Sequence, residues 1–151
     1  MKAEFSQPCC TAIQIALFEL LSKCGIRLAA VVGHSSGEIA AAFACGAITA
    51  SDAIRVAYYR GKMTGFLATS RPGAMAAIGL GMPEVLPLLR PGVVVGCENS
   101  PESVTLTGDA EQVKTVVEAI KAEHPQVLAR LLRVNVAYHS GKLNTIAGSP
   151  P

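Results

Sequence analysis

The chain has few charged residues and almost no excess of one sign. Charged residues make up 16% of its 151 residues, and the formal net charge is +2. So small a charge does not indicate binding to nucleic acid or to an anionic membrane surface. The chain also lacks an uninterrupted apolar stretch of about eighteen residues, and no basic region followed by an apolar core stands at its N-terminus. We therefore expect no nucleic-acid partner, no membrane partner and a cytoplasmic location.

Paired metal-ligand spacing and internal repeats are absent as well. The five cysteines are Cys9, Cys10, Cys24, Cys45 and Cys97, and they do not fall at the spacing of a metal site. Most stand in apolar surroundings, so we expect buried thiols in a reducing compartment and no metal. The 50% of apolar residues favour a compact core, but α/β enzymes usually need a longer chain, which suggests a fragment.

The most informative stretch runs from Val31 to Glu38 and reads Val-Val-Gly-His-Ser-Ser-Gly-Glu. A Gly-x-Ser-x-Gly turn between a strand and a helix is the signature of a nucleophile elbow, in which a strained backbone projects the serine hydroxyl. Ser35 is that serine. The N–H of Ser36 opens the next helix and can donate to an oxyanion.

Apolar spacing predicts three helices and one strand in the first half of the chain. A helix starting at Ser6 and Pro8 should stop at Gly25. After it we expect a strand over 28–32, a helix over 37–45 and a helix over 51–69. The last helix should bury Ile54, Ala57, Tyr58 and Met63. Pro72-Gly73 is the best domain boundary.

The second half predicts a small mixed subdomain. Strands are expected over 74–80, 93–97, 104–107 and 127–136, with a short helix over 83–89 and a longer one capped by Gly108 or Asp109. The longer helix should bury Val113, Val116, Val117 and Ile120. The resulting order, strand-helix-strand-strand-helix-strand, is the ferredoxin-like (βαββαβ) plan.

Three motifs together resemble a known family. Gly-His-Ser-Ser-Gly-Glu over 33–38, Cys-Gly-Ala-Ile-Thr over 45–49 and Tyr-Arg-Gly-Lys over 59–62 are similar to the acyltransferase domain of polyketide synthases, particularly the fungal multidomain type. That domain is similar to malonyl-CoA:acyl-carrier-protein transacylase. The resemblance implies an α/β fold with a partial hydrolase-like core over 1–72, a ferredoxin-like subdomain over 73–134, and a return segment with a disordered tail over 135–151.

A serine nucleophile needs a base within reach, and the chain has three histidines. His34 would point to the opposite side of a strand from Ser35, and His124 stands before Pro125 at a helix end, as surface histidines often do. His139 follows the last predicted strand. By itself such a histidine is more often structural, but Ala-Tyr-His-Ser over 137–140 matches the catalytic histidine motif of the family.

Other site residues depend on the resemblance. Arg60 on a predicted helix would ordinarily be a solvated residue, but Arg60-Gly61 matches the family arginine that pairs with a malonyl carboxylate. Tyr138 stands where malonyl-selecting relatives often carry a bulky aromatic residue, which favours malonyl. Met63 is displaced by one residue from a family methionine. Asn99 ordinarily marks a turn, yet the family has a similar Asn-x-Pro near its cleft.

Parts of the family pattern are missing. The glycine- and glutamine-rich segment whose amide backs the oxyanion hole has no match before Phe5, Gln7 belongs to a later motif, and no second glutamine follows His139. Residues 141–151 also depart from the family. We expect a premature end, for instance at a misread exon junction, and sequencing of the transcript across Ser140 tests this.

The resemblance implies acyl transfer through Ser35 and His139, with Ser36 N–H at the oxyanion and with Arg60, Tyr138 and Asn99 at the substrate. Malonyl-CoA would be the donor and the phosphopantetheine thiol of an acyl carrier protein the acceptor, with no tightly bound cofactor. Other synthase domains would be the partners. Two alternatives stay open: a serine ester or thioester hydrolase, which would not need Arg60, and a truncated, non-catalytic fragment.

Overall fold

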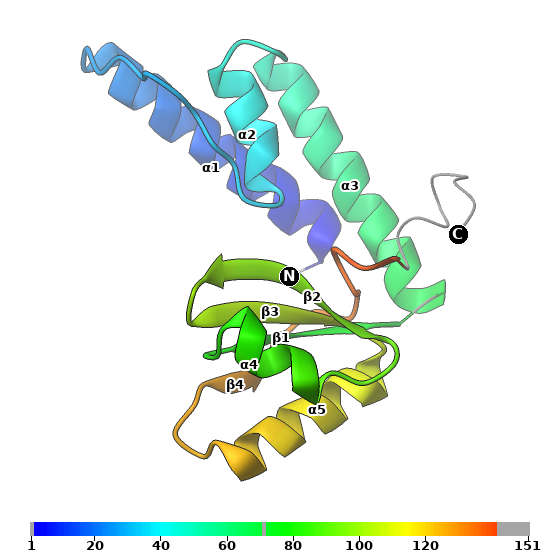
Figure 1. The fold of residues 1–151 in the computed structure, drawn as a ribbon. Coiled ribbons are helices and arrows are strands. Elements are labelled where there is room, and N and C mark those ends of the chain that lie inside the picture. The colour runs from blue at the N-terminus through cyan, green and yellow to red at the C-terminus, as the bar shows by residue number, and fades with distance from the viewer. Residues whose placement is uncertain (1, 71, 142–151) are drawn as a thin grey trace. The chain divides into compact units, whose positions relative to one another are not determined.

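The computed structural model describes residues 2–70 and 72–141, which form two compact units. The first unit ends at Phe66 and contains the helices α1 (Ala3–Lys23) and α2 (Gly37–Ala44); α3 (Ala50–Ser70) begins in it and runs into the second (Figure 1). The tail expected to be disordered lies almost entirely outside the described residues. The domain division predicted at Pro72-Gly73, with its return segment, stays a prediction.

Helix α1 begins earlier than the sequence predicts. The N–H groups of Phe5 and Ser6 both donate to the carbonyl of Lys2, at 3.1 and 3.0 Å, so the first turn forms before Ser6. Ser6 therefore lies inside the helix and does not cap it, and Pro8 is an interior proline. The predicted end is right, because Gly25 follows the helix with φ of 82°, the left-handed conformation that glycine adopts easily.

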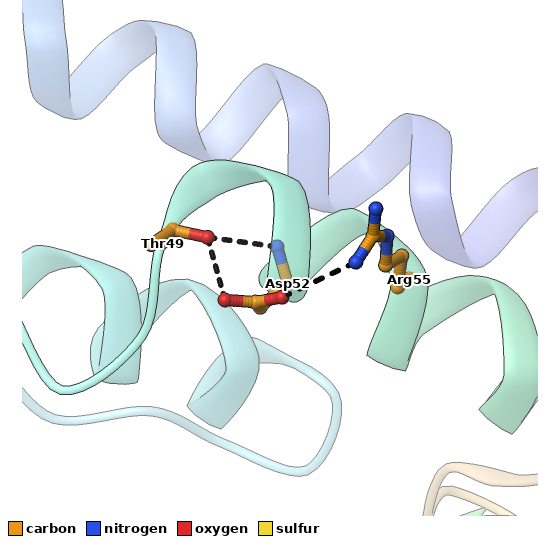
Figure 2. Close-up of polar contacts among 3 residues, drawn as sticks. All are labelled: Thr49, Asp52 and Arg55. Atoms are coloured by element: carbon orange, nitrogen blue, oxygen red, sulfur yellow. Dashed lines mark hydrogen bonds and ion pairs between the residues drawn. The ribbon is translucent and has the colours of Figure 1, made fainter.

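Helix α3 begins at Ala50, one residue before the predicted start, and Thr49 caps it (Figure 2). The Thr49 hydroxyl accepts a hydrogen bond from the Asp52 N–H at 3.1 Å and donates to the Asp52 carboxylate at 2.6 Å. An Arg55 nitrogen lies 3.8 Å from the other carboxylate oxygen. This reciprocal arrangement satisfies a backbone donor that the helix leaves unpaired.

The buried face of α3 was predicted only in part. Its buried residues recur every three or four positions: Ala53, Ala57, Gly61, Thr64 and Leu67. Ile54 is half-buried. Ala57 is confirmed. Tyr58 and Met63, however, are 39% and 46% exposed, because they stand one position away from that stripe on each side. An exposed Met63 gives no support to a place in a substrate pocket.

The strand predicted over 28–32 is wrong. No described residue pairs with this segment, which Figure 1 draws as a connection between α1 and α2 without a strand. Val32 is 96% exposed. An apolar run can be a strand only where another strand supplies the hydrogen-bond ladder, and the described part of the chain offers none here.

The expectation of buried thiols is also wrong. Cys9, Cys10, Cys24 and Cys45 are exposed and Cys97 is half-buried, and all five are free thiols. The apolar neighbours that suggested burial are themselves exposed, among them Leu20 and Leu21 near the end of α1. The cysteines therefore say nothing about a packed core in the first unit.

The second unit is built on a four-stranded antiparallel sheet. Its strands are β1 (Ala74–Ile78), β2 (Val93–Ser100), β3 (Ser103–Gly108) and β4 (Ala129–Leu131), in the order β2-β3-β1-β4. Between them lie α4 (Met82–Val85), the short 3-10 helix η1 (Leu86–Leu88) and α5 (Ala110–Glu123). This is the predicted ferredoxin-like arrangement, although β4 is much shorter than the strand expected over 127–136.

The core of this unit lies between one face of the sheet and its helices. Helix α5 buries the four residues that the sequence predicts, Val113, Val116, Val117 and Ile120. They pack against Ile78 of β1 and Leu106 of β3, both fully buried, and Val85 of α4 completes the layer. Alternation along β3 places Val104 and Leu106 on this face, so the hydrophobic pattern fixes which side the helices cover.

Candidate active site

The predicted elbow has the geometry of a tight, strained turn. Ser35 has φ of 53°, in the left-handed region that residues with a side chain rarely adopt. The carbonyls of His34 and Ser35 accept hydrogen bonds from the N–H groups of Gly37 and Glu38, at 2.9 and 3.3 Å. A Cβ on Gly33 would overlap the backbone of Glu38 and lie 2.7 Å from the carbonyl carbon of Gly37. Only glycine fits at position 33.

The second glycine of the signature is under less constraint. A Cβ on Gly37 would meet only the side-chain nitrogen of Gln14, at an ordinary 3.9 Å. Ser36 occupies the N-cap position of α2. Among the described residues no backbone acceptor is recorded for its N–H, which leaves it suited to donate to an oxyanion at the start of the helix.

Arg60 lies beside Ser35, as the predicted substrate-binding role requires. From the half-buried middle of α3, its Nη2 donates to the Ser35 Oγ at 3.4 Å. Its Nη1 donates to the Oε1 of Gln7 on α1 at 2.8 Å. A residue of the elbow, one of α1 and one of α3 thus form a polar cluster within the first unit.

Gln7 is the member of this cluster that the sequence did not single out for a role. A glutamine in the early turns of a helix is usually solvated, and no spacing in the chain links it to Arg60. The contact depends on how closely α1 and α3 approach. A Cβ on Gly61 would overlap the carbonyl oxygen of Ala3 and lie 2.8 Å from the Cα of Glu4.

His34 lies apart from the polar cluster. It is exposed and lines a hollow between α1 and α2 together with Phe18 and Ala41, and Ser35 is not among the residues that line this hollow. The edge-to-face contact of Phe18 with Phe43, at 5.5 Å between ring centroids, packs the two helices there. The arrangement favours a structural or solvated role for His34. His124 is exposed after α5, in line with its expected surface position.

His139 belongs to the second unit, in a segment that is anchored back onto the sheet. Val136 and Ala137 are 3% and 2% exposed, and the Gly73 N–H donates to the carbonyl of Asn135 at 3.1 Å. His139 itself is exposed and has φ of 58°. Its Cβ lies 3.4 Å from where a Cβ on Gly96 would stand, next to an irregularity in the β2–β3 register. Bulges of this kind often re-aim residues near active sites.

Tyr138 and Asn99 also belong to this unit. Tyr138 is half-buried immediately before His139. The Asn99 side-chain amide donates to the Thr105 hydroxyl at 3.0 Å, across the β2–β3 hairpin. That bond gives Asn99 a structural task, so its place at a substrate stays a prediction. No group of three or more potential metal ligands occurs within 2–70 and 72–141, and no helix in these ranges is long and apolar enough to cross a membrane.

An α/β fold with a strained Gly-x-Ser-x-Gly turn and an arginine beside its serine is the arrangement expected of a protein with a serine nucleophile. The chain belongs to the acyl transferase domain family, whose model matches residues 1–149. The departure from the family that was expected after Ser140 is therefore wrong as far as residue 149. It is 56% identical over 147 residues to the highly reducing polyketide synthase pspA of Penicillium soppii, an alignment that covers 97% of this chain and 6% of that protein.

Solved structures support the family at the level of the fold. The acyltransferase domain of phenolphthiocerol/phthiocerol synthase A from Mycobacterium bovis (BCG) matches with a TM-score of 0.86 and 29% identity, over 98% of this chain and 56% of that one. FabD from Acinetobacter baumannii matches with a TM-score of 0.85 and 28% identity, over 97% of this chain and 49% of that one. The chain therefore spans about half of each of these solved chains.

Proposed function

We propose that the chain carries the nucleophile and the base of an acyltransferase that moves a malonyl group from coenzyme A, through an acyl-serine, to the phosphopantetheine thiol of an acyl carrier protein. The observation that carries this proposal is the 3.4 Å approach of the Arg60 guanidinium to the Ser35 hydroxyl. In a malonyl thioester a single carbon separates the free carboxylate from the reacting carbonyl. A cation this close to the nucleophile suits an acyl group of that length.

In the first step Ser35 Oγ attacks the thioester carbonyl and its proton passes to the imidazole of His139. The oxyanion that forms accepts a hydrogen bond from Ser36 N–H. The carbon–sulfur bond then breaks, and His139 returns the proton to the departing coenzyme A thiolate. In the second step the phosphopantetheine thiol attacks the acyl-serine, and the same imidazole takes the thiol proton and delivers it to Ser35 Oγ.

Arg60 forms a two-pronged pair with the malonyl carboxylate during both steps, which a planar guanidinium does better than an ammonium group. Tyr138, next to His139, limits the space beside the acyl group and favours malonyl over branched relatives. Coenzyme A and the phosphopantetheine arm are substrates, so the reaction needs no resident cofactor. The carrier protein and the neighbouring synthase domains are the proposed partners, and the cytosol is the proposed location.

Labelling with radioactive malonyl-CoA, followed by denaturing electrophoresis, tests the proposal. The wild-type chain should keep covalent label, and Ser35→Ala should keep none. Ser36→Ala is the matched control, because it removes a neighbouring hydroxyl but keeps the backbone N–H, and it should label like the wild type. Absence of label on a wild-type chain with a native circular dichroism spectrum would overturn the proposal and favour a non-catalytic fragment.

An uncharged substrate, tested on the same chain, distinguishes a malonyl transferase from a serine hydrolase. Arg60→Ala should lose most malonyl labelling but retain its reaction with p-nitrophenyl acetate, which has no carboxylate for the guanidinium to bind. If wild type released free malonate at the rate at which it formed the acyl-serine, even with a carrier protein present, hydrolysis would be the better description.

A further inference from the structure

We infer that Gln7 is a positioning residue, which holds the Arg60 guanidinium against the nucleophile and so sets the preference for a carboxylated acyl group. The inference rests on the proposed function and adds a residue to it. It depends on one contact, the 2.8 Å hydrogen bond from Arg60 Nη1 to Gln7 Oε1. That bond is shorter than the 3.4 Å contact from Arg60 Nη2 to Ser35 Oγ.

An arginine side chain has a long flexible stem, and its planar head must be fixed before it can pair with a carboxylate in two places. Gln7 fixes one end of that plane from another helix, 53 positions away in the sequence. Because the two bonds use different nitrogens of one rigid group, the Gln7 contact restricts where the other nitrogen can stand relative to Ser35.

The chemistry of the holding group also matters. A glutamine oxygen accepts a hydrogen bond without bringing a negative charge, so the guanidinium keeps its full attraction for an incoming carboxylate. An aspartate or glutamate in the same place would compete with the substrate for the cation. A neutral acceptor is therefore the suitable partner for an arginine that has to bind an acid.

The packing of the two helices is set by a neighbour of Arg60. A Cβ on Gly61 would overlap the carbonyl oxygen of Ala3 and lie 2.7 Å from its carbonyl carbon. Gln7 is one helical turn further along α1 than Ala3. The close approach that Gly61 allows thus brings the Gln7 side chain within reach of Arg60.

The test compares two substrates on the full chain. Gln7→Met keeps the volume and removes the acceptor, so we expect malonyl labelling to fall about tenfold or more, the usual size of a lost bond to a charged group. Reaction of Ser35 with p-nitrophenyl acetate should stay within about twofold of wild type. Gln112→Met on α5 is the matched control and should change neither rate.

Two further results decide between positioning and general damage. The double variant Gln7→Met, Arg60→Ala should label no more slowly than Arg60→Ala alone, because the two residues act through one contact. An equal loss with both substrates in Gln7→Met would overturn the inference and indicate that Gln7 only stabilises the fold.

A measurement that does not need turnover separates this inference from the proposed function. Nuclear magnetic resonance of the Arg60 guanidinium reports how fast its Nη groups rotate, and Gln7→Met should accelerate that rotation relative to wild type. If wild type took no malonyl label, the proposed function would fail while this comparison still tested the contact. Equal rotation in the two proteins would overturn the positioning role.

Discussion

At the scale of single residues, Ser35 and His139 share an unusual backbone. Their φ angles are 53° and 58°, and among the described residues no other non-glycine residue has a positive φ. Each such conformation costs on the order of 1–3 kcal/mol and persists only where the surroundings impose it. Glu38 is packed against Gly33 at the elbow, and the buried Val136 and Ala137 precede His139. Strained backbone of this kind is frequent at functional sites, which agrees with the roles proposed for both residues.

The two glycines of the elbow should differ sharply in tolerance. Gly33→Ala would drive a Cβ into the backbone of Glu38, where no side chain can yield. We expect a loss of at least a hundredfold in malonyl labelling and a destabilisation of about 1–3 kcal/mol, as for other overpacked sites. Labelling rates and thermal unfolding measure the two effects.

Gly37→Ala serves as the control within the same motif. Its Cβ would make a single ordinary contact, 3.9 Å from Gln14, and alanine favours a helix more than glycine does. Stability should stay equal or rise slightly, and labelling should stay within a few fold. Equal damage from both substitutions would show that the signature requires its glycines for a reason other than the close approach at position 33.

Sequence alone could predict the residues that belong to a local motif. Ser35 and Ser36 belong to a short pattern whose mechanism is known, whereas Arg60 was singled out only by its match to the family. The structure brings Arg60 to Ser35. Gln7 could not be predicted in the same way, because its contact depends on the distance between two helices. Whether His139 reaches Ser35 is a question of the same long-range kind, and it stays a proposal.

At the scale of elements, the structure places the start of α3 slightly earlier than the sequence predicts. Thr49 caps α3, and its hydroxyl binds both the N–H and the carboxylate of Asp52. Thr49→Ala should therefore destabilise the helix by about 1 kcal/mol. The change should appear as a lower midpoint in urea denaturation followed by helical circular dichroism.

Ser51→Ala is the informative comparison, since the sequence placed the start of the helix there. Ser51 is exposed and lies within the first turn, so its loss should change stability by less than about 0.5 kcal/mol. Arg55→Ala should also have a small effect, because the arginine and Asp52 side chains are 72% and 51% exposed. A larger effect for Ser51 than for Thr49 would contradict the cap.

Elements were predictable where their partners are close in the chain. Helix α5 makes its backbone hydrogen bonds within itself, and β2 and β3 make theirs with each other. Their hydrophobic patterns were therefore sufficient to predict them. The 28–32 segment was not, because an apolar run becomes a strand only when another strand accepts it. The exposed Val32 shows an apolar pattern without such a partner.

At the scale of the whole molecule, apolar burial is divided unevenly between the two units. The hydrophobic core cluster lies entirely between Ala76 and Ala129, in the second unit. In the first unit Ile13, Leu17 and Leu20, which share one stripe of α1, are 62%, 54% and 57% exposed. The first unit therefore buries much less apolar area than the second. Buried apolar area is the main source of stability.

This division predicts a two-level pattern of hydrogen exchange. Amides of β3 and α5 should exchange slowly, at rates set by opening of the core, whereas amides of α1 and of the 28–32 segment should exchange earlier. Leu106→Ala, which removes a fully buried side chain, should cost about 2–5 kcal/mol in the second unit. It should accelerate exchange in β1, β3 and α5 together.

Leu86→Ala provides the control, because Leu86 is 52% exposed and its truncation should leave these rates nearly unchanged. Exchange in α1 should be the same in wild type, Leu106→Ala and Leu86→Ala if the units are stabilised separately. Mass spectrometry of peptides from α1 and α5 makes the comparison directly. Protection of α1 equal to that of α5, and lost together with it in Leu106→Ala, would show instead that one cooperative core stabilises both units, against the distribution of buried side chains.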